Sequence, residues 1–318
     1  MWLYLAVLLG LYFLRRWYRE RQTVENLRDK YVLITGCDSG FGNQLARQLD
    51  ARGLRVLAAC LTQPGAEELR KATSERLQTV ILDVTRTDSI AAATAWVKAQ
   101  VGDRGLWGLV NNAGAVLPTG PNEWLTKDDF VKVLDVNLIG LIEVTLSLLP
   151  LVKRARGRLV SVSSILGRLA FYGGGYCPSK YGVEAFSDSL RRELRPFGVQ
   201  VAMVEPGYFR TPMTDVQRNL ECVEQLWRRA PPEIKASYGQ HYFDHLHRRF
   251  RETLLTRCSR NLYLVTDCLE HALTARHPHT RYSGGWDAQF FYIPLSYLPT
   301  AWADWVLTRG WPRPAQAV

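Results

Sequence analysis

Tyr176 and Lys180 are four residues apart, so their side chains share one face of a predicted helix. A free tyrosine has a pKa of ~10 and is a poor base near neutral pH. A neighbouring ammonium favours the phenolate and lowers that pKa, which would let Tyr176 take a proton from an alcohol. The spacing alone is a weak signal, because Tyr-x-x-x-Lys also arises by chance.

Two serines and an asparagine-rich run add to this signal. Ser163 and Ser164 follow an apolar run at 159–162, and Asn111-Asn112-Ala113-Gly114 ends another apolar run. A serine hydroxyl can hydrogen-bond a substrate oxygen as negative charge develops on it. Side chains alternate along a strand, so only one of the two serines can face the site.

A glycine-rich loop predicts a nucleotide. The run Thr35-Gly36-Cys37-Asp38-Ser39-Gly40-Phe41-Gly42 follows an apolar stretch at 31–35 and precedes a helical one at 43–52. Glycines permit positive φ and let main-chain N–H groups approach a pyrophosphate at the start of a helix. The alternative is a tight turn without a ligand, but the strand before and the helix after favour a dinucleotide-binding loop.

The charges near this loop favour NAD over NADP. The second predicted strand ends in Ala59-Cys60-Leu61-Thr62, which offers neither an acid for the adenosine ribose nor an arginine for a 2′-phosphate. Asp38, in the loop, would repel a phosphate. Asp83, which closes the third predicted strand, is expected to accept a hydrogen bond from the adenine amine; the alternative is a helix N-cap.

The elements that must position these residues alternate along the chain. Continuously apolar strands alternating with amphipathic helices predict an α/β fold, a Rossmann-like doubly wound parallel sheet, with ligands at the carboxyl ends of the strands. The predicted strands are 31–35, 56–60, 79–82, 108–111, 159–162 and 201–204, and the predicted helices are 43–52, 65–73, 90–101, 126–154 and 176–197.

The two ends of the chain differ from this domain. Residues 1–28 are predicted to be an N-terminal membrane anchor with a basic flank, because the apolar run 2–14 precedes Arg15 and Arg16. As a helix that run rises only ~20 Å against a hydrocarbon core of ~30 Å, so it spans or lies in one leaflet. A cleaved signal peptide and a buried core helix are the weaker alternatives. Residues 29–285 form the single Rossmann domain, within which 208–280 are expected to be a substrate lobe.

The aromatic segment 286–318 forms the third part of the chain. Its stretch 290–311 is rich in Trp, Tyr, Phe and Leu, and Pro294 and Pro299 argue against a second membrane span. Two interpretations remain open for it: it caps a lipophilic pocket, or it dips into the membrane interface.

Composition excludes several classes of protein. The chain has 318 residues, 47% of them hydrophobic, and a net charge of +10, which is typical of a globular protein and not of a disordered, collagenous or polytopic membrane chain. The charge is diffuse, so no nucleic-acid partner is expected. Six cysteines without CxxC spacing predict reduced thiols. His241, His245 and His247 are interpreted as a solvated helix face, and no metal is expected.

Taken in order, these motifs together with Asn137 and Pro206-Gly207 resemble the short-chain dehydrogenase/reductase family over about residues 30–280. The segments 34–42, 174–180 and 184–192 are similar to the branch of microsomal retinol dehydrogenases and oxidative 3α-hydroxysteroid dehydrogenases, as are the apolar start and the ending at 311–318.

The resemblance implies roles for the motif residues. Tyr176 would be the general base, Lys180 would also hold the nicotinamide ribose, and Ser164, the second serine of the pair, would bind the substrate oxygen. Asn137 would hold a water that links Lys180 to solvent; the alternative is a polar residue at a helix kink. Substrate contacts are expected from Ser164 and Tyr176. The expected cofactor contacts are Gly36, Ser39, Gly40, Phe41, Gly42, Asp83, Asn111, Ala113, Gly114, Tyr176, Lys180, Pro206, Gly207 and Thr211.

The implied activity is NAD-dependent oxidation of a lipophilic alcohol, either all-trans-retinol or a 3α- or 17β-hydroxysteroid. An NADPH-dependent carbonyl reductase and a catalytically silent lipid-binding protein of the same fold are the alternatives. The endoplasmic reticulum membrane is the expected location. Charge bias favours a cytosolic catalytic domain and leaves the lumenal side open. The resemblance also allows a homodimer.

Overall fold

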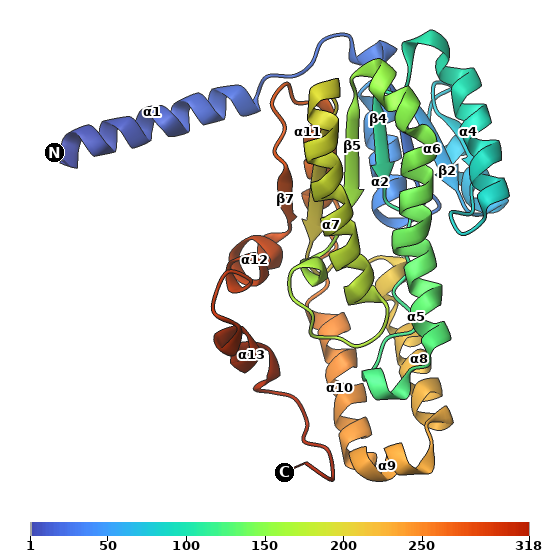
Figure 1. Ribbon diagram of the computed structural model, residues 1–318, viewed down its shortest axis with the longest axis vertical. Helices are drawn as coiled ribbons and strands as arrows, with labels where there is room; N and C mark the ends of the chain where they lie inside the picture. Colours follow the sequence, from blue (N-terminus) through green and yellow to red (C-terminus); the bar gives the residue numbers. More distant parts are fainter. Residues whose placement is uncertain (1, 318) are drawn as a thin grey trace.

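The fold is built on a seven-stranded parallel sheet with the order β3-β2-β1-β4-β5-β6-β7 (Figure 1). The computed structural model describes residues 2–317. Six strands lie where the apolar runs predict them, whereas β7 was not predicted because its sequence, Arg-Tyr-Ser-Gly, is not an apolar run. The strands are β1 (Tyr31–Thr35), β2 (Arg55–Cys60), β3 (Gln78–Ile81), β4 (Gly108–Asn111), β5 (Arg158–Val162), β6 (Gln200–Pro206) and β7 (Arg281–Gly284).

Helices cover both faces of the sheet, which explains why its strands are apolar throughout. In β1, Val32 and Ile34 pack into the core beneath α2 (Gly40–Ala51), α3 (Gln63–Lys71) and α11 (Tyr263–Thr274). Leu33 packs into the opposite core beneath α4 (Thr87–Val101), α6 (Gly140–Ala155) and α7 (Tyr176–Leu194). The predicted α/β, Rossmann-like, doubly wound sheet is therefore confirmed.

The long helix expected at 126–154 is interrupted. It consists of α5 (Lys127–Leu134), a π-helical turn at Asp135–Ile139, and α6. A π-helical turn widens the helix and is frequent at functional sites. Here the turn contains Asn137, whose side chain is fully buried against the segment that follows β4.

A helical lobe lies beyond the carboxyl ends of the strands (Figure 1). It contains α8 (Val216–Arg229), α9 (Pro232–Tyr238) and α10 (Gln240–Thr256). Trp124, Trp227 and Tyr242 form its aromatic core, and the Trp124 and Trp227 ring centroids are 4.8 Å apart. The chain then returns to the sheet through α11 and β7 and ends in α12 (Ile293–Leu295) and α13 (Thr300–Thr308).

The N-terminal helix α1 (Trp2–Glu20) projects away from the domain (Figure 1). Its described side chains from Val7 to Tyr18 are exposed. Its last residue, Glu20, contacts His279 at 3.1 Å, and the chain after it is tied down by a main-chain hydrogen bond from Val24 to Thr274. Within residues 2–317, the helical stretch that is long and apolar enough to cross a membrane is Lys127–Ala155, which packs against β4 and α4 in this fold.

Candidate active site

The carboxyl end of β5 and the start of α7 bring Ser164, Tyr176 and Lys180 together. The Lys180 Nζ lies 5.6 Å from the centre of the Tyr176 ring and donates a hydrogen bond of 2.8 Å to the carbonyl of Val162. The Ser164 side chain is close enough to Tyr176 to lower the pKa of its hydroxyl. The Ser163 hydroxyl lies instead beside Gly167, where a Cβ would be only 2.7 Å away. Strand alternation thus turns Ser164, and not Ser163, toward the tyrosine.

Burial governs the protonation of the pair. It raises the pKa of Tyr176 to about 12, against the lowering effect of the Ser164 side chain. It lowers the pKa of Lys180 to about 8, against the attraction of the Glu184 carboxylate. Burial is the largest influence on the tyrosine pKa in this structure, and its lowering by Lys180 together with a positive nicotinamide stays a prediction.

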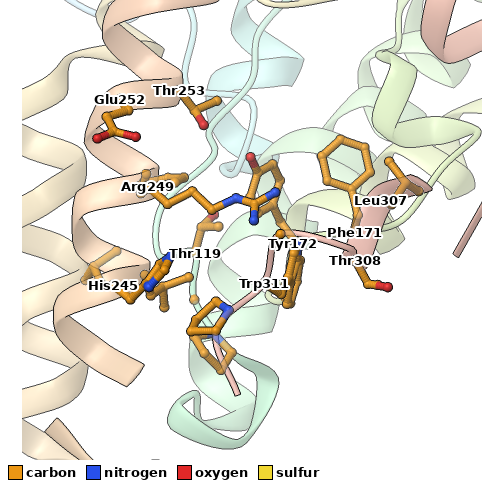
Figure 2. A pocket seen from close by; sticks show the side chains of 18 of the residues that line it. Thr119, Phe171, Tyr172, His245, Arg249, Glu252, Thr253, Leu307, Thr308 and Trp311 are labelled. Carbon is orange, nitrogen blue, oxygen red and sulfur yellow. The ribbon is translucent and has the colours of Figure 1, made fainter. Parts of the chain in front are cut away.

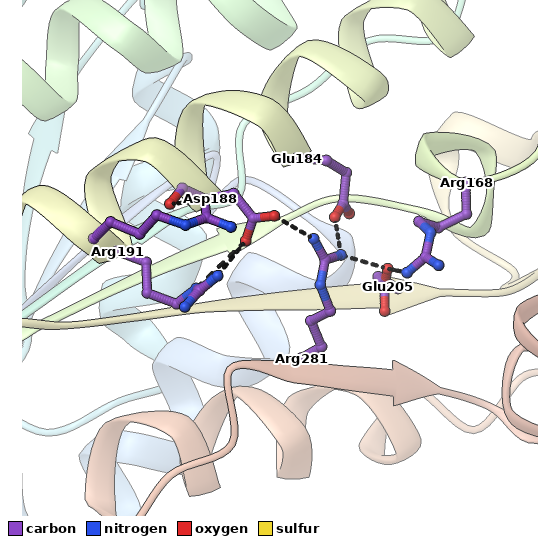
Figure 3. A network of polar contacts seen from close by, with 7 residues as sticks. Arg168, Glu184, Asp188, Arg191, Glu205 and Arg281 are labelled. Atoms are coloured by element: carbon purple, nitrogen blue, oxygen red, sulfur yellow. Dashed lines mark hydrogen bonds and ion pairs between the residues drawn. The ribbon is translucent and has the colours of Figure 1, made fainter.

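A charged network fixes α7 against the edge of the sheet. Arg281 on β7 pairs with Glu184 and, at 3.1 Å, with Asp188, both on α7 (Figure 3). It also pairs with Glu205 on β6 at 3.0 Å, and Arg168 reaches the same carboxylate. The strand that the sequence pattern did not predict thus supplies the cation that positions the helix carrying Tyr176 and Lys180.

Asn137 connects this helix to the end of β4. Its Nδ2 donates hydrogen bonds to the Ala115 carbonyl at 2.8 Å and to the Ser179 hydroxyl at 2.9 Å. Its Oδ1 accepts from the Ala115 N–H at 2.7 Å. All the polar atoms of the side chain are therefore used inside the protein, so a relay water at this residue has to be held by its main chain.

Close contacts with the segment that follows β4 fix the shape of the glycine loop. Gly36 has a φ of +71°, and a Cβ there would lie 2.9 Å from the Cα of Ala113. Asn112 Nδ2 donates to the carbonyls of Thr35 and Gly36 at 2.8 and 3.0 Å. The Thr35 hydroxyl accepts from the Asn112 and Ala113 N–H groups. Thr35 and Asn112 were not predicted as site residues, although both lie inside the motifs; their role is to shape the loop.

The rest of the loop lies under the segment that follows β6. The Thr211 methyl group is 3.5 Å from the position a Cβ would take at Gly40, and the Phe41 and Phe209 ring centroids are 5.4 Å apart. Ser39 is the N-cap of α2, but its side chain makes no capping hydrogen bond. The first N–H groups of α2 are thus not capped by a side chain at this position, which suits a phosphate.

The loop also brings an acid to the end of β2. The Asp38 carboxylate accepts hydrogen bonds from the N–H groups of Leu61 and Thr62 at 2.7 and 2.9 Å and from the Thr62 hydroxyl at 2.7 Å. An acid is therefore present beside the residues that end β2, where the local sequence lacks one. The sequence around the end of β2 does not reveal this acid, because Asp38 is 23 residues away from Leu61 in the chain.

Three more of the predicted cofactor contacts lie beside polar side chains of the protein. Gly114 lies close to the Asn137 side chain, and Gly207 packs against the Asp287 carboxylate so closely that a Cβ would lie 2.2 Å from it. The Asn111 side chain turns away from the loop and donates to the Thr145 hydroxyl at 2.8 Å, so only its main chain can face a cofactor.

Two further residues of the predicted set lie at strand ends. The Asp83 carboxylate closes a turn by accepting from the Thr85 N–H and hydroxyl, and the N-cap of α4 is Arg86 and not Asp83. Pro206 ends β6 beside Gly284 of β7. Both therefore lie at the carboxyl edge of the sheet, on the same side as the glycine loop.

A cavity of about 1000 Å³ opens at the loop 170–173, which precedes α7 (Figure 2). The Tyr208 hydroxyl donates to the Tyr172 hydroxyl at 3.0 Å, and both residues pack in one cluster with Tyr176. Tyr176 itself does not line the cavity, whose nearest walls to it are the loop 170–173 and Tyr208. Its other walls come from the loop 119–123, from α10 and from residues 304–312.

The described part of the chain contains no metal-binding cluster of side chains and no disulfide. Among residues 2–317, no group of three or more His, Cys, Asp and Glu side chains could hold a metal ion. All six cysteines are free, with three of them buried. His247 contacts Glu224 at 3.1 Å, and His241 and His245 lie on the exposed side of α10.

Comparisons with known proteins agree with this geometry. A family model described as short chain dehydrogenase matches residues 30–221. The chain is 69% identical over 318 residues to human (Homo sapiens) 17-beta-hydroxysteroid dehydrogenase type 6 and 63% identical over 318 residues to human retinol dehydrogenase 16, covering 100% of each chain. A solved short-chain dehydrogenase from Streptomyces avermitilis superposes with a TM-score of 0.66 at 26% identity, covering 88% of this chain and 98% of that one.

Proposed function

Because the chain belongs to the short-chain dehydrogenase family, we propose that it is an NAD-dependent dehydrogenase that oxidises retinol or a 3α- or 17β-hydroxysteroid. The observation that carries the proposal is the convergence of Ser164, Tyr176 and Lys180, with an aromatic cavity at the loop 170–173 that precedes the helix carrying the tyrosine. The names of the two human relatives, a hydroxysteroid and a retinol dehydrogenase, support the substrate class.

The residues around the glycine loop fit a nicotinamide dinucleotide. A Cβ at Gly42 would lie 2.4 Å from the Gly36 carbonyl, so the loop depends on a bare main chain at this point. The start of α2 offers N–H groups to a pyrophosphate. When bound, the nicotinamide supplies a hydride acceptor and a positive charge. We propose that Gly36, Ser39, Gly40, Phe41, Gly42 and Thr211 hold the cofactor, together with Asp83, Ala113, Gly114, Pro206, Gly207 and the main chain of Asn111.

The three catalytic side chains have different tasks. The Ser164 hydroxyl donates a hydrogen bond to the substrate oxygen and orients it toward Tyr176. The Tyr176 oxygen accepts the hydroxyl proton of the alcohol, which needs a tyrosine pKa well below the value that burial alone imposes. The Lys180 ammonium, beside the ring and bound to the Val162 carbonyl, favours the phenolate. We further propose that it binds the nicotinamide ribose and that the Asn137 main chain holds the water through which the proton leaves.

Asp38 supports NAD over NADP. Its carboxylate is held at the end of β2 by three hydrogen bonds, the place where a doubly wound fold binds the adenosine ribose. A 2′-phosphate there would meet a fixed negative charge. A ribose 2′-hydroxyl could instead donate a hydrogen bond to it.

We also propose that the protein is held at the endoplasmic reticulum membrane by α1, with the catalytic domain in the cytosol. A second contact would come from the C-terminal segment, where Trp286, Phe290, Tyr297, Trp302 and Trp305 are between 62% and 71% exposed. Exposed aromatics of this kind are typical of membrane interfaces. The α12–α13 region lies on the side of the domain from which α1 projects (Figure 1).

A substrate panel tests the proposal. Membranes containing the protein are given NAD and either retinol, a 3α,17β-dihydroxysteroid or a short aliphatic alcohol, and NADH formation is recorded. We expect oxidation of the two lipid alcohols and little of the short one. Equal rates on all three would contradict the lipid substrate, faster turnover with NADPH and a ketone would favour a reductase, and no turnover would favour a silent lipid-binding protein.

A further inference from the structure

The cavity contains cationic side chains where α10 faces Tyr172. Arg249 extends from α10 into the cavity, with its guanidinium near Tyr172 (Figure 2). A Cβ at Gly310 would lie 2.5 Å from Arg249 Nη1, so the C-terminal segment packs directly against the guanidinium. Arg249 is half-buried, and none of the carboxylates within residues 2–317 forms an ion pair with it.

A second arginine, Arg257, lines the same cavity. Arg257 Nη1 donates a hydrogen bond of 3.2 Å to the Tyr292 hydroxyl. Both arginines favour the ionised form of Tyr172, although burial dominates and raises the pKa of that tyrosine. The guanidinium groups of Arg249 and Arg257 therefore lie within electrostatic reach of one point in the cavity.

Acidic side chains nearby do not neutralise this point. Glu123, Glu252 and Asp304 also line the cavity, and all three are exposed to solvent. Figure 2 shows the Glu252 carboxylate directed away from the Arg249 guanidinium. A partly desolvated cation that lacks a carboxylate partner is stabilised by a bound anion, and such groups are typical of binding sites.

The size of the cavity leaves room for such an anion. Its volume of about 1000 Å³ is at the upper end of the usual range for small-molecule sites, roughly 300–1,000 Å³. Its lining combines aromatic side chains, such as Phe171, Tyr172 and Tyr208, with the two arginines. A neutral alcohol would fill the aromatic part and leave the two guanidinium groups without an anionic partner.

We propose that Arg249 and Arg257 form an anion subsite in this cavity, so that preferred substrates carry a carboxylate or sulfate in addition to the reacting hydroxyl. The inference rests on the proposed function and narrows its substrate class to amphipathic lipid alcohols. Arginine suits this role because its planar fork can bind two oxygens of the anion at once.

Matched substrates test the subsite. A 3α-hydroxysteroid with a side-chain carboxylate is compared with its methyl ester, and a 3α-hydroxysteroid with a 17-sulfate is compared with its 17-hydroxyl parent. We expect the wild type to have a lower KM for each anion. Arg249→Gln should raise the KM of the preferred anion on the order of 10- to 100-fold, the usual effect of losing a hydrogen bond to a charged group, and leave the neutral partner within about twofold.

Two further variants serve as controls. Arg251→Gln removes an exposed arginine of α10 that does not line this cavity, and it should leave both KM values unchanged. Arg249→Lys keeps the charge and loses the fork, so its KM should be intermediate. Equal wild-type KM values for anion and neutral partner, or an equal rise for both in Arg249→Gln, would overturn the subsite.

A binding measurement separates this inference from the proposed function. Quenching of tryptophan fluorescence in the Tyr176→Phe variant reports binding of each steroid without turnover. If the wild type oxidises none of the four steroids, the proposed function fails, while tighter binding of the anions that depends on Arg249 would still support the subsite. Binding that does not distinguish anion from neutral partner would overturn it.

Discussion

Different interactions stabilise two regions of this molecule: the glycine loop, called here the cofactor end, and the helical lobe α8–α10, called the lipid end. Around the glycine loop, Thr35, Asp38 and Asn112 make side-chain hydrogen bonds of 2.7–3.0 Å to the main chain. In the lobe, Trp124 and Trp227 instead pack by their faces and edges. Hydrogen bonds fix atoms in one position, whereas packed apolar groups tolerate changes of shape. We infer that the chemistry is fixed at one end and that the substrate range is set at the other.

A large effect is expected from the serine pair, because it lies at the cofactor end. Ser164→Ala should lower kcat on the order of 10²- to 10³-fold, since it removes a hydrogen-bond donor to the developing oxyanion. Ser163→Ala is the matched control and should stay close to wild type, because the Ser163 hydroxyl is buried and finds no hydrogen-bond partner within residues 2–317. Steady-state kinetics on one steroid decide between them, and equal losses in the two variants would contradict the assignment.

The buried lysine should be a cost to stability. Its folded pKa of about 8 is below the ordinary 10.5, so the unfolded chain binds its proton more tightly. Lys180 therefore lowers the free energy of unfolding by up to about 3 kcal/mol at neutral pH, and the loss shrinks as the pH rises from 8 to 10.5. We expect Lys180→Met to be inactive, yet more stable than wild type at pH 7 and equal to it near pH 10.5.

Urea denaturation of both proteins at matched pH measures this difference. The contribution of buried tyrosines, whose raised pKa values favour the folded state below pH 10, is common to both proteins and cancels in the comparison. A stability gap that stays constant between pH 7 and 10.5, or a less stable variant, would show that Lys180 is not held in the site as described.

A smaller effect is expected for the choice between the two nicotinamide cofactors. Asp38→Asn removes the fixed charge at the end of β2 while keeping the size of the side chain. The ratio of kcat/KM for NAD to that for NADP should fall about tenfold, the equivalent of one weakened charge interaction. Cofactor titrations at a saturating steroid concentration measure the ratio, and an unchanged ratio would mean that Asp38 only shapes the loop.

The smallest effect on chemistry is expected at the C-terminal helix α13. Trp302 and Trp305 are 66% and 63% exposed, so replacing both by alanine should leave kcat on a detergent-dispersed substrate and the Tm nearly unchanged. Retention on liposomes should weaken if these side chains enter the membrane interface. The comparison is made in a protein without residues 1–20, so that α1 does not contribute to retention. If the double variant is retained there as well as the protein with both tryptophans, Trp302 and Trp305 have another role.

The same contrast explains what the sequence could predict. Six strands follow from apolar runs and the Tyr176–Lys180 pair from its four-residue spacing, whereas the choice of Ser164 over Ser163 follows from the family resemblance. The position of Asp38 at the end of β2 and the pairing of Arg281 with Glu184 depend on contacts between distant segments. The burial of Tyr176, which raises its pKa, likewise cannot be predicted from a four-residue spacing.

The central claim is that the Tyr176 oxygen takes the proton of a lipid alcohol, and one comparison tests it most directly. Wild type and Tyr176→Phe are mixed with NAD and a 3α-hydroxysteroid, and NADH formation is followed by its absorbance after circular dichroism has shown that both are folded. We expect the variant to lose at least about 10³-fold in kcat while still binding NADH. A variant that forms NADH at the wild-type rate would contradict the account.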